Sequence, residues 1–293
     1  RDLQFIADYT VLPVVHLRLR NTWALERLKA HSKVLSIDEI RTTRPTLTES
    51  LPLINQPGVQ AAGYAGSGTT VCVLDSGVDY TRAAFGSCTA PGTPAGCKVV
   101  AAVDIAANDG MLDDPALGRH GTNVAATVLG VAPNARIAAL DVFSGGTASS
   151  NDILSAINWC IANRATYNIV AINMSLGGGR YYNAISPTDS VGLALQNARN
   201  AGIATVVASG NEAYTDSIAW PAAYNNVVSV VAVSLSAFGS IGYGGCSDAT
   251  TAADKVTCFS NSASFLSMLA PGASVNAGAI AMSGTSHAAP HVA

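Results

Sequence analysis

The sequence is poor in charged and in aromatic side chains. Charged residues make up 12% of its 293 residues, and Phe, Trp and Tyr together make up 6%. Disordered chains combine high charge with few apolar residues, whereas 49% of this chain is hydrophobic. The composition therefore excludes a disordered chain and predicts a globular protein with a large core.

The sequence also lacks long apolar runs and dense basic segments. No window approaches the 18 or more consecutive apolar residues of a membrane-spanning helix, and the strongest runs, such as 227–233, have the length of a strand. A nucleic-acid binder needs a dense basic face, and nothing after residue 45 supplies one. We expect neither a membrane span nor a nucleic-acid partner.

Charge is distributed unevenly along the chain. Residues 1–45 hold eight of the 16 bases and five of the 19 acids, a net charge of +3, which leaves 8 bases and 14 acids, a net charge of −6, for residues 46–293. Such an asymmetry indicates a domain boundary. We predict a small basic unit over 1–45 and a large acidic domain over 46–293, with residues 41–50 as an exposed linker.

The basic unit has the pattern of a strand, a helix and a second strand. Apolar and polar residues alternate from Val15 to Arg20, as in a half-buried strand. Asn21 can cap a short helix that ends near His31, and the alternation resumes at Leu35 and Ile37.

The larger domain alternates between short apolar runs and small-residue helical stretches. We predict strands at 70–74, 99–103, 135–142, 169–174, 203–208 and 227–233, and helices at 121–128, 151–164 and 188–201. Buried runs separated by helices are typical of a doubly wound α/β fold, in which a mostly parallel sheet is covered on both faces. Functional residues of such folds lie in the loops that follow the strands.

The six cysteines lie in two kinds of surroundings. Four lie in loops rich in Gly, Ser, Thr and Pro, and their spacing predicts two local disulfides, Cys88–Cys97 and Cys246–Cys258. Cys72 and Cys160 lie in apolar segments, which favours buried free thiols over a long-range disulfide. None has the spacing of a zinc site. Two disulfides indicate a secreted or otherwise extracytoplasmic protein.

Polar residues stand at several positions where an α/β fold places its chemistry. Asp75, Ser175 and Asn211 each follow a predicted strand, His120 begins a predicted helix, and Ser286 lies in a Gly-Thr-Ser segment near the end of the sequence. Each alone has a structural explanation, since such residues often cap helices or form turns. Together they supply an acid, a base, a nucleophile and an amide donor.

Three segments resemble the signatures of the subtilisin-like serine proteases, the subtilase family. The family patterns V-I-D-[ST]-G-[IV], H-G-T-H-V-A and G-T-S-M-A-x-P-H-V-A correspond here to VLDSGV at 73–78, HGTNVA at 120–125 and GTSHAAPHVA at 284–293. The order acid, histidine, serine is the one known from subtilisin. The resemblance covers most of residues 46–293 and implies the subtilisin-like form of the doubly wound fold.

The resemblance implies a role for each motif residue. Ser286 is the nucleophile, His120 the general base and acid, and Asp75 the group that orients His120. Asn211, in a segment similar to the family's A-A-G-N-E, is the oxyanion donor. We therefore expect a serine endopeptidase that cleaves polypeptides and needs no cofactor for catalysis.

The resemblance also implies an extended substrate site. Its residues are Ser175, Leu176, Gly177, Ala208, Ser209, Gly210, Gly145 and Gly146. The first three would pair with a substrate strand and the next three would line the primary specificity pocket, while the last two form either a second substrate edge or only a turn. The small residues of the pocket wall predict broad specificity, with an apolar or small P1 side chain.

The basic unit resembles the C-terminal part of a subtilase propeptide, the alternative being an added strand-helix decoration. A propeptide would bind and inhibit the domain and be removed by autoprocessing near residues 44–50. The sequence stops at Ala293 within an apolar stretch of small residues, whereas relatives continue. We expect a domain truncated at its C-terminus, and a monomer.

The sequence departs from the family pattern in ways that bear on metals and packing. His287 stands where the family usually has Met, and we expect it to pack; His287 and His291 lie four apart, but without a carboxylate or cysteine they predict no metal site. A calcium loop that many relatives insert is absent. One acidic segment could bind structural calcium through its oxygens, but the sequence favours an exposed, solvated loop there: Asp104, Asp109, Asp113 and Asp114. The resemblance also predicts a cis bond between Trp220 and Pro221.

Two other functions fit the sequence less well. An α/β-hydrolase esterase nearly fits the segment 284–288, but that fold places the acid and the histidine after the serine, and the seven residues that follow Ser286 include no acid. A catalytically inactive, subtilase-like binding module is disfavoured because all three triad residues and Asn211 are present.

Overall fold

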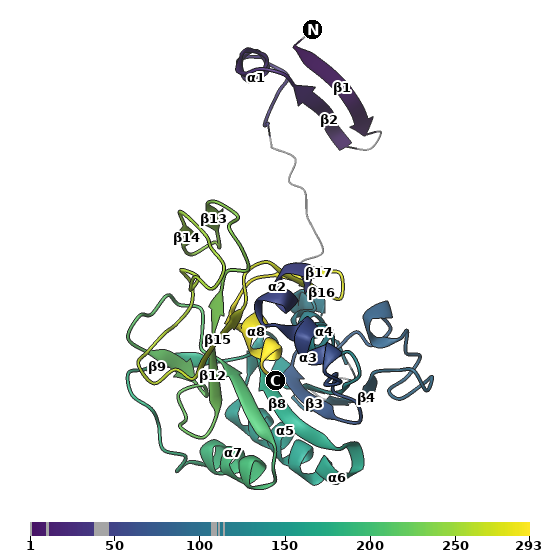
Figure 1. The fold of residues 1–293 in the computed structure, drawn as a ribbon, viewed down its shortest axis with the longest axis vertical. Helices are drawn as coiled ribbons and strands as arrows, with labels where there is room; N and C mark the ends of the chain where they lie inside the picture. Colours follow the sequence, from purple (N-terminus) through teal and green to yellow (C-terminus); the bar gives the residue numbers. More distant parts are fainter. Residues whose placement is uncertain (1, 10–11, 38–46, 107–109, 111, 114) are drawn as a thin grey trace. The chain divides into compact units, whose positions relative to one another are not determined.

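A computed structural model describes the chain except for residues 1, 10–11, 38–46, 107–109, 111 and 114 (Figure 1). The chain divides into two compact units, Arg1–Arg44 and Pro45–Ala293. Each is described by itself.

The first unit is a β-hairpin followed by a helix. Strand β1 (Leu3–Tyr9) pairs antiparallel with β2 (Leu12–Leu19), and α1 (Thr22–Lys29) is capped by Asn21, whose side chain accepts a hydrogen bond of 2.9 Å from the Ala24 amide. The predicted strand at Leu35 and Ile37 is wrong. Leu35 is 97% exposed, and the described partner of β2 is β1, the strand that precedes it in sequence.

The second unit is built on seven parallel strands, which confirms the predicted α/β fold. Their order in the sheet is β15-β12-β10-β8-β3-β5-β4. The strands are β3 (Thr70–Asp75), β4 (Val99–Asp104), β5 (Arg136–Asp141), β8 (Ile169–Met174), β10 (Ala204–Ala208), β12 (Val228–Val233) and β15 (Met268–Pro271). The sequence predicts six of them. The seventh, β15, is a short edge strand with two exposed residues, and it was missed.

Helices cover both faces of this sheet. Val71 and Val73 of β3 pack in one core with α4 (His120–Val131), whereas Cys72 and Leu74 pack in another with α5 (Ser150–Ala162) and α7 (Ser190–Asn200). Successive side chains of a strand point to opposite faces. Both faces are therefore buried, and the central strands have nearly continuous apolar sequences.

Residues 47–50 are not a linker, contrary to the prediction. They belong to α2 (Leu47–Leu53), in which Ser50 is fully buried. A Cβ at Gly130 of α4 would lie 2.6 Å from Leu47 Cδ1, so the two helices are in close contact. The neighbouring α3 (Gln56–Ala61) is tied to the end of α4, because Gln56 Nε2 donates to Val131 O at 2.9 Å. Residues 41–46 of the predicted linker lie outside the described residues.

Four two-stranded ribbons and several single turns of helix complete the unit. The ribbons are β6 (Phe143–Ser144) with β7 (Thr147–Ala148), β9 (Gly178–Tyr181) with β11 (Ile218–Trp220), β13 (Ile241–Gly242) with β14 (Ser247–Asp248), and β16 (Val275–Ala277) with β17 (Ile280–Met282). The short helices are α6 (Arg164–Tyr167), α8 (Thr285–Ala288), η1 (Ala83–Phe85), η2 (Pro115–Leu117) and η3 (Ala289–His291). The Trp220–Pro221 bond is cis, as predicted, and so is Thr93–Pro94.

Three disulfides join the six cysteines. The structure forms Cys88–Cys97 and Cys246–Cys258, and it also joins Cys72 to Cys160. The preference for free thiols at the last pair is therefore wrong. Cys72 on β3 and Cys160 on α5 are both fully buried, on the same side of the sheet, with Cα atoms 6.5 Å apart. An apolar setting does not prevent pairing when the fold brings two thiols together.

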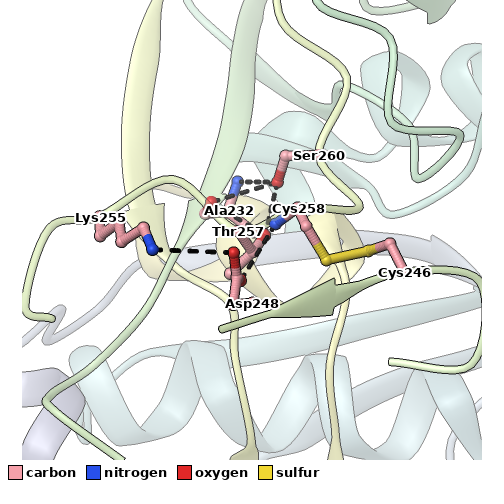
Figure 2. The surroundings of a disulfide bond; sticks show 7 residues. All are labelled: Ala232, Cys246, Asp248, Lys255, Thr257, Cys258 and Ser260. Atoms are coloured by element: carbon pink, nitrogen blue, oxygen red, sulfur yellow. Dashed lines mark hydrogen bonds and ion pairs between the residues drawn. A yellow bond between two sulfur atoms is a disulfide. The ribbon is translucent and has the colours of Figure 1, made fainter. Parts of the chain in front are cut away.

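The Cys246–Cys258 bond braces the β13–β14 ribbon against the loop beside β12 (Figure 2). Asp248 of β14 accepts a hydrogen bond of 3.1 Å from the Cys258 amide, and Lys255 Nζ lies 4.0 Å from the same carboxyl group.

Among the described residues, none of the helices has the length and the apolar surface that crossing a bilayer requires.

Candidate active site

Asp75 and His120 meet at the carboxyl edge of the sheet. Asp75 is the last residue of β3, His120 is the first of α4, and His120 Nδ1 lies 2.7 Å from Asp75 Oδ1. The Ser76 amide donates to the same oxygen at 2.8 Å, and the Gly121 amide donates to Ser76 Oγ at 3.2 Å. Asp75 is 1% exposed. The carboxylate thus fixes the ring orientation and the Nδ1–H tautomer of His120.

Gly121 permits this close approach. A Cβ at this position would lie 2.2 Å from the Gly77 carbonyl oxygen and 3.1 Å from Asp75 Oδ1. No side chain fits in that space. The helix that carries the base can begin beside the acid only because residue 121 is glycine.

The surroundings of His120 favour its charged form. Burial alone would lower the pKa of His120, but the negative charge of Asp75 and the hydrogen bond to it outweigh burial and raise that pKa above its usual 6.5. A histidine with a raised pKa accepts a proton readily, and Asp75 stabilises the imidazolium that results.

The acidic loop beside His120 forms ion pairs. Arg119, which precedes His120 in a left-handed conformation (φ 59°), lies 3.1 Å from Asp113 and 3.5 Å from Asp79. Burial raises the pKa of Asp113. Of the acids considered as calcium ligands, Asp109 and Asp114 lie outside the described residues. Within the described part of the chain, no group of three or more His, Cys, Asp or Glu is arranged to hold a metal ion.

Ser286 lies in α8 and is held by the end of β8. Its hydroxyl donates to the Ser175 carbonyl oxygen at 3.2 Å, and the Ser175 hydroxyl donates to the Ser286 carbonyl oxygen at 2.6 Å. Asn173 Nδ2 donates to Ser175 Oγ at 2.9 Å. Two segments that are 111 residues apart are therefore joined by reciprocal hydrogen bonds, and Ser175 supports the nucleophile as well as lining the cleft.

Asn211 is oriented by the residue before the nucleophile. Thr285 donates to Asn211 Oδ1 twice, from its amide at 2.8 Å and from its hydroxyl at 3.0 Å, and the Gly210 amide donates to Thr285 Oγ1 at 3.1 Å. Since the oxygen of the Asn211 amide faces Thr285, its nitrogen is left to donate elsewhere.

Ser286 and Asn211 line a cleft of about 600 Å³. Of the predicted substrate-binding residues, Ser175, Leu176, Gly177, Ala208, Gly210 and Gly146 also line it. Ser209 and Gly145 do not. Ser209 is fully buried and its hydroxyl donates to Asn261 O at 2.8 Å, and Gly145 lies with Gly146 in the turn between β6 and β7.

Sequence reasoning missed several residues of the cleft and its supports. Aromatic side chains of Phe143, Tyr181 and Trp220 line the cleft, as does Glu212. Glu212 follows Asn211 directly, and Trp220 precedes the predicted cis proline. Their position beside residues that the sequence singled out could have identified both. Phe143 and Tyr181 had no such signal, because each lies in a short ribbon without a strong pattern.

The class of the protein follows from what lies at one edge of its parallel sheet. A buried acid is bonded there to a histidine, and the same edge holds a serine on a helix and an oriented asparagine amide. This is an α/β protein with polar side chains gathered where the parallel strands of its sheet end. The chain belongs to the subtilase family, whose family model matches residues 66–293.

Relatives and a solved structure agree with this assignment. The chain is 31% identical to subtilisin E of Bacillus subtilis (strain 168), over 92% of this chain and 66% of that protein, and 32% identical to subtilisin of Bacillus pumilus, over 82% of this chain and 79% of that one. The match to a thermostable alkaline protease of Halalkalibacterium halodurans, at 28% identity, covers 100% of this chain and 73% of that protein. A cold-adapted subtilisin-like serine proteinase superposes with a TM-score of 0.59 at 27% identity, over 78% of this chain and 74% of that one. The chain thus spans just under two thirds of the length of subtilisin E.

Proposed function

We propose that this chain is the catalytic part of a serine endopeptidase. The observation that carries the proposal is the 2.7 Å contact of His120 with buried Asp75, on the edge of the sheet where Ser286 and Asn211 line one cleft. An inactive binding module has no need of a buried carboxylate that raises the pKa of a histidine.

Each residue has a defined role in the reaction. The Ser286 hydroxyl passes its proton to His120 Nε2 as its oxygen attacks the substrate carbonyl carbon, and Asp75 stabilises the resulting imidazolium. The Asn211 amide donates to the oxyanion that forms. His120 then gives the proton to the leaving amine, and water, activated by the same histidine, releases the acid product and restores Ser286.

The cleft suits an extended peptide with an apolar or small P1 side chain. Gly177, Ala208 and Gly210 leave room beside the nucleophile, and the backbone at 175–177 can pair with a substrate strand. Glu212 is engaged within the protein, since the Asn261 side chain and the backbone N–H of Asn211 both donate to its Oε2. This favours broad specificity. A peptide series that shows an absolute requirement for Lys or Arg at P1 contradicts it.

The first unit would act as an inhibitory propeptide that the enzyme removes. In support, the match to the alkaline protease extends over it. Residues 44–46 are the part of the expected processing region that precedes α2, and a cut within 47–50 would break a helix in which Ser50 is buried. Three disulfides suit an oxidising, extracytoplasmic compartment.

A fluorophosphonate probe tests the catalytic proposal. The wild-type chain should be labelled at Ser286, and the variants Ser286→Ala and His120→Ala should not. Absence of labelling on folded wild-type protein refutes the protease and favours a binding module. The processing proposal predicts that intact wild-type protein loses the mass of the first unit while Ser286→Ala keeps it. Equal, unprocessed masses contradict it.

A further inference from the structure

Asn123 lies in α4, one turn after His120, and uses both ends of its buried amide. Its Nδ2 donates to the Ile280 carbonyl oxygen at 2.6 Å and lies 3.4 Å from the carbonyl oxygens of Val275 and Ala277. Carbonyl oxygens can only accept hydrogen bonds, so the amide nitrogen must face the β16–β17 ribbon. The amide oxygen is left as an acceptor on the opposite side.

His287 fills that acceptor. Its Nδ1 lies 2.8 Å from Asn123 Oδ1, and both residues are buried. Because Asn123 accepts, the proton must be on Nδ1, and neutral His287 therefore has a bare Nε2.

The surroundings keep His287 neutral. Burial first, and then the neighbouring His120 and His291, hold the pKa of His287 well below its usual 6.5. The strands packed against α8, namely β10, β12 and β15, carry no titratable side chain. The rings of His120 and His287 are 5.2 Å apart. A positive charge on His287 would oppose the imidazolium that His120 must become.

The bond joins the elements that carry the base and the nucleophile. Asn123 belongs to the helix that begins at His120, His287 directly follows Ser286, and the β16–β17 ribbon leads into α8. One buried amide thus ties three elements together.

The two residues also depart together from the subtilase pattern, which has His at 123 and Met at 287. A Met at 287 has no donor for Asn123 Oδ1, which would stay buried without a partner. A His at 123 beside His287 cannot reproduce the amide's contacts with the ribbon. Each replacement is thus suited to the other.

We propose that Asn123 and His287 are positioning residues that set the alignment of Ser286 with His120. This inference rests on the proposed protease function. Neither residue needs to touch the substrate. Their effect should therefore fall on kcat, because a displacement of about 1 Å can cost about 100-fold in rate.

A swap experiment tests the pair. We expect His287→Met and Asn123→His each to lower kcat at least about 10-fold with little change in KM, and the double variant to recover most of the loss. His287→Gln, whose amide can still donate to Asn123, should retain more activity than His287→Met. The matched control is Asn226→Ala, which removes a buried hydrogen bond of 3.1 Å to Gly192 O between residues that do not line the cleft, and which should lower Tm without lowering kcat. Losses that multiply in the double variant, or that follow Tm as in the control, overturn the proposal.

An imidazole ¹⁵N spectrum tests the bond without activity. In the Ser286→Ala chain, His287 should be neutral at pH 6.5, with its proton on Nδ1. Titration near 6.5, or a proton on Nε2, overturns the pair. If wild-type protein is neither labelled by the fluorophosphonate nor cleaves peptides, the proposed function fails, and the spectrum still decides the hydrogen bond.

Discussion

Removal of the Cys72–Cys160 bond should cost more stability than removal of either local disulfide. The bond joins β3, the strand that ends in Asp75, to α5, across 88 residues of sequence. The natural comparison is Cys88–Cys97, which spans only 9 residues. All four sulfur atoms belong to buried residues, so truncation to Ala removes similar packing from both pairs.

The magnitude follows from the loops that each bond closes. In the chain-entropy account, a loop of 88 residues contributes about 4.6 kcal/mol to the free energy of unfolding, and a loop of 9 residues contributes about 2.6 kcal/mol. Cys72→Ala/Cys160→Ala should therefore lose about 2 kcal/mol more than Cys88→Ala/Cys97→Ala.

Urea unfolding measures the difference. Both double variants are made in a Ser286→Ala background, so that the unfolded protein is not digested, and are compared by their midpoints and slopes. A thiol titration of the denatured, unreduced parent should find no free thiol. Two reactive thiols that map to Cys72 and Cys160, or equal losses of stability in the two variants, refute the reasoning.

Three further predictions concern catalysis. The kcat/KM of the wild type should rise with pH as His120 loses its proton, with a midpoint above 6.5. Asp75→Asn should move that midpoint down, because only burial then acts on the pKa of His120. A pH-rate profile of this variant should also show kcat lowered about 10⁴-fold. Asn211→Asp keeps both bonds from Thr285 but loses the donor, so steady-state kinetics should show a fall in kcat of at least about 10²- to 10³-fold, the loss known for such a donor in subtilisin; an unchanged kcat contradicts the oxyanion role. Gly121→Ala forces its Cβ against Gly77 O, so kcat should fall about 100-fold in protein whose circular dichroism shows a native fold.

The fold was largely predictable because its central strands are buried on both faces. Nearly continuous apolar runs of five to eight residues separated by helical stretches have few other solutions, and six of the seven strands follow that pattern. The exceptions lie where burial is partial. The edge strand β15 has two exposed residues, and the predicted strand at Leu35 and Ile37 lacked the neighbouring strand that a sheet requires.

Some residues of the site could also be predicted from the sequence, and others could not. Asp75, His120, Ser286 and Asn211 stand in short segments that resemble the subtilase signatures, and this resemblance predicts their roles. Their supports do not, because a hydrogen bond between Ser175 and Ser286, or between Asn123 and His287, joins residues that are more than 100 positions apart. A local sequence pattern cannot predict which distant residues will form a buried hydrogen bond with each other.

The sequence by itself determined the layered α/β fold and the charge boundary between the two units, since these depend on periodicity and composition, and its short motifs predicted which residues would be reactive. Only the tertiary structure decided that Cys72 and Cys160 pair, that residues 47–50 form a buried helix, and that Asn123 carries His287 beside the base. Both thiol partners and both hydrogen-bond partners are chosen by the packing of distant segments, and packing becomes definite only when the core has formed.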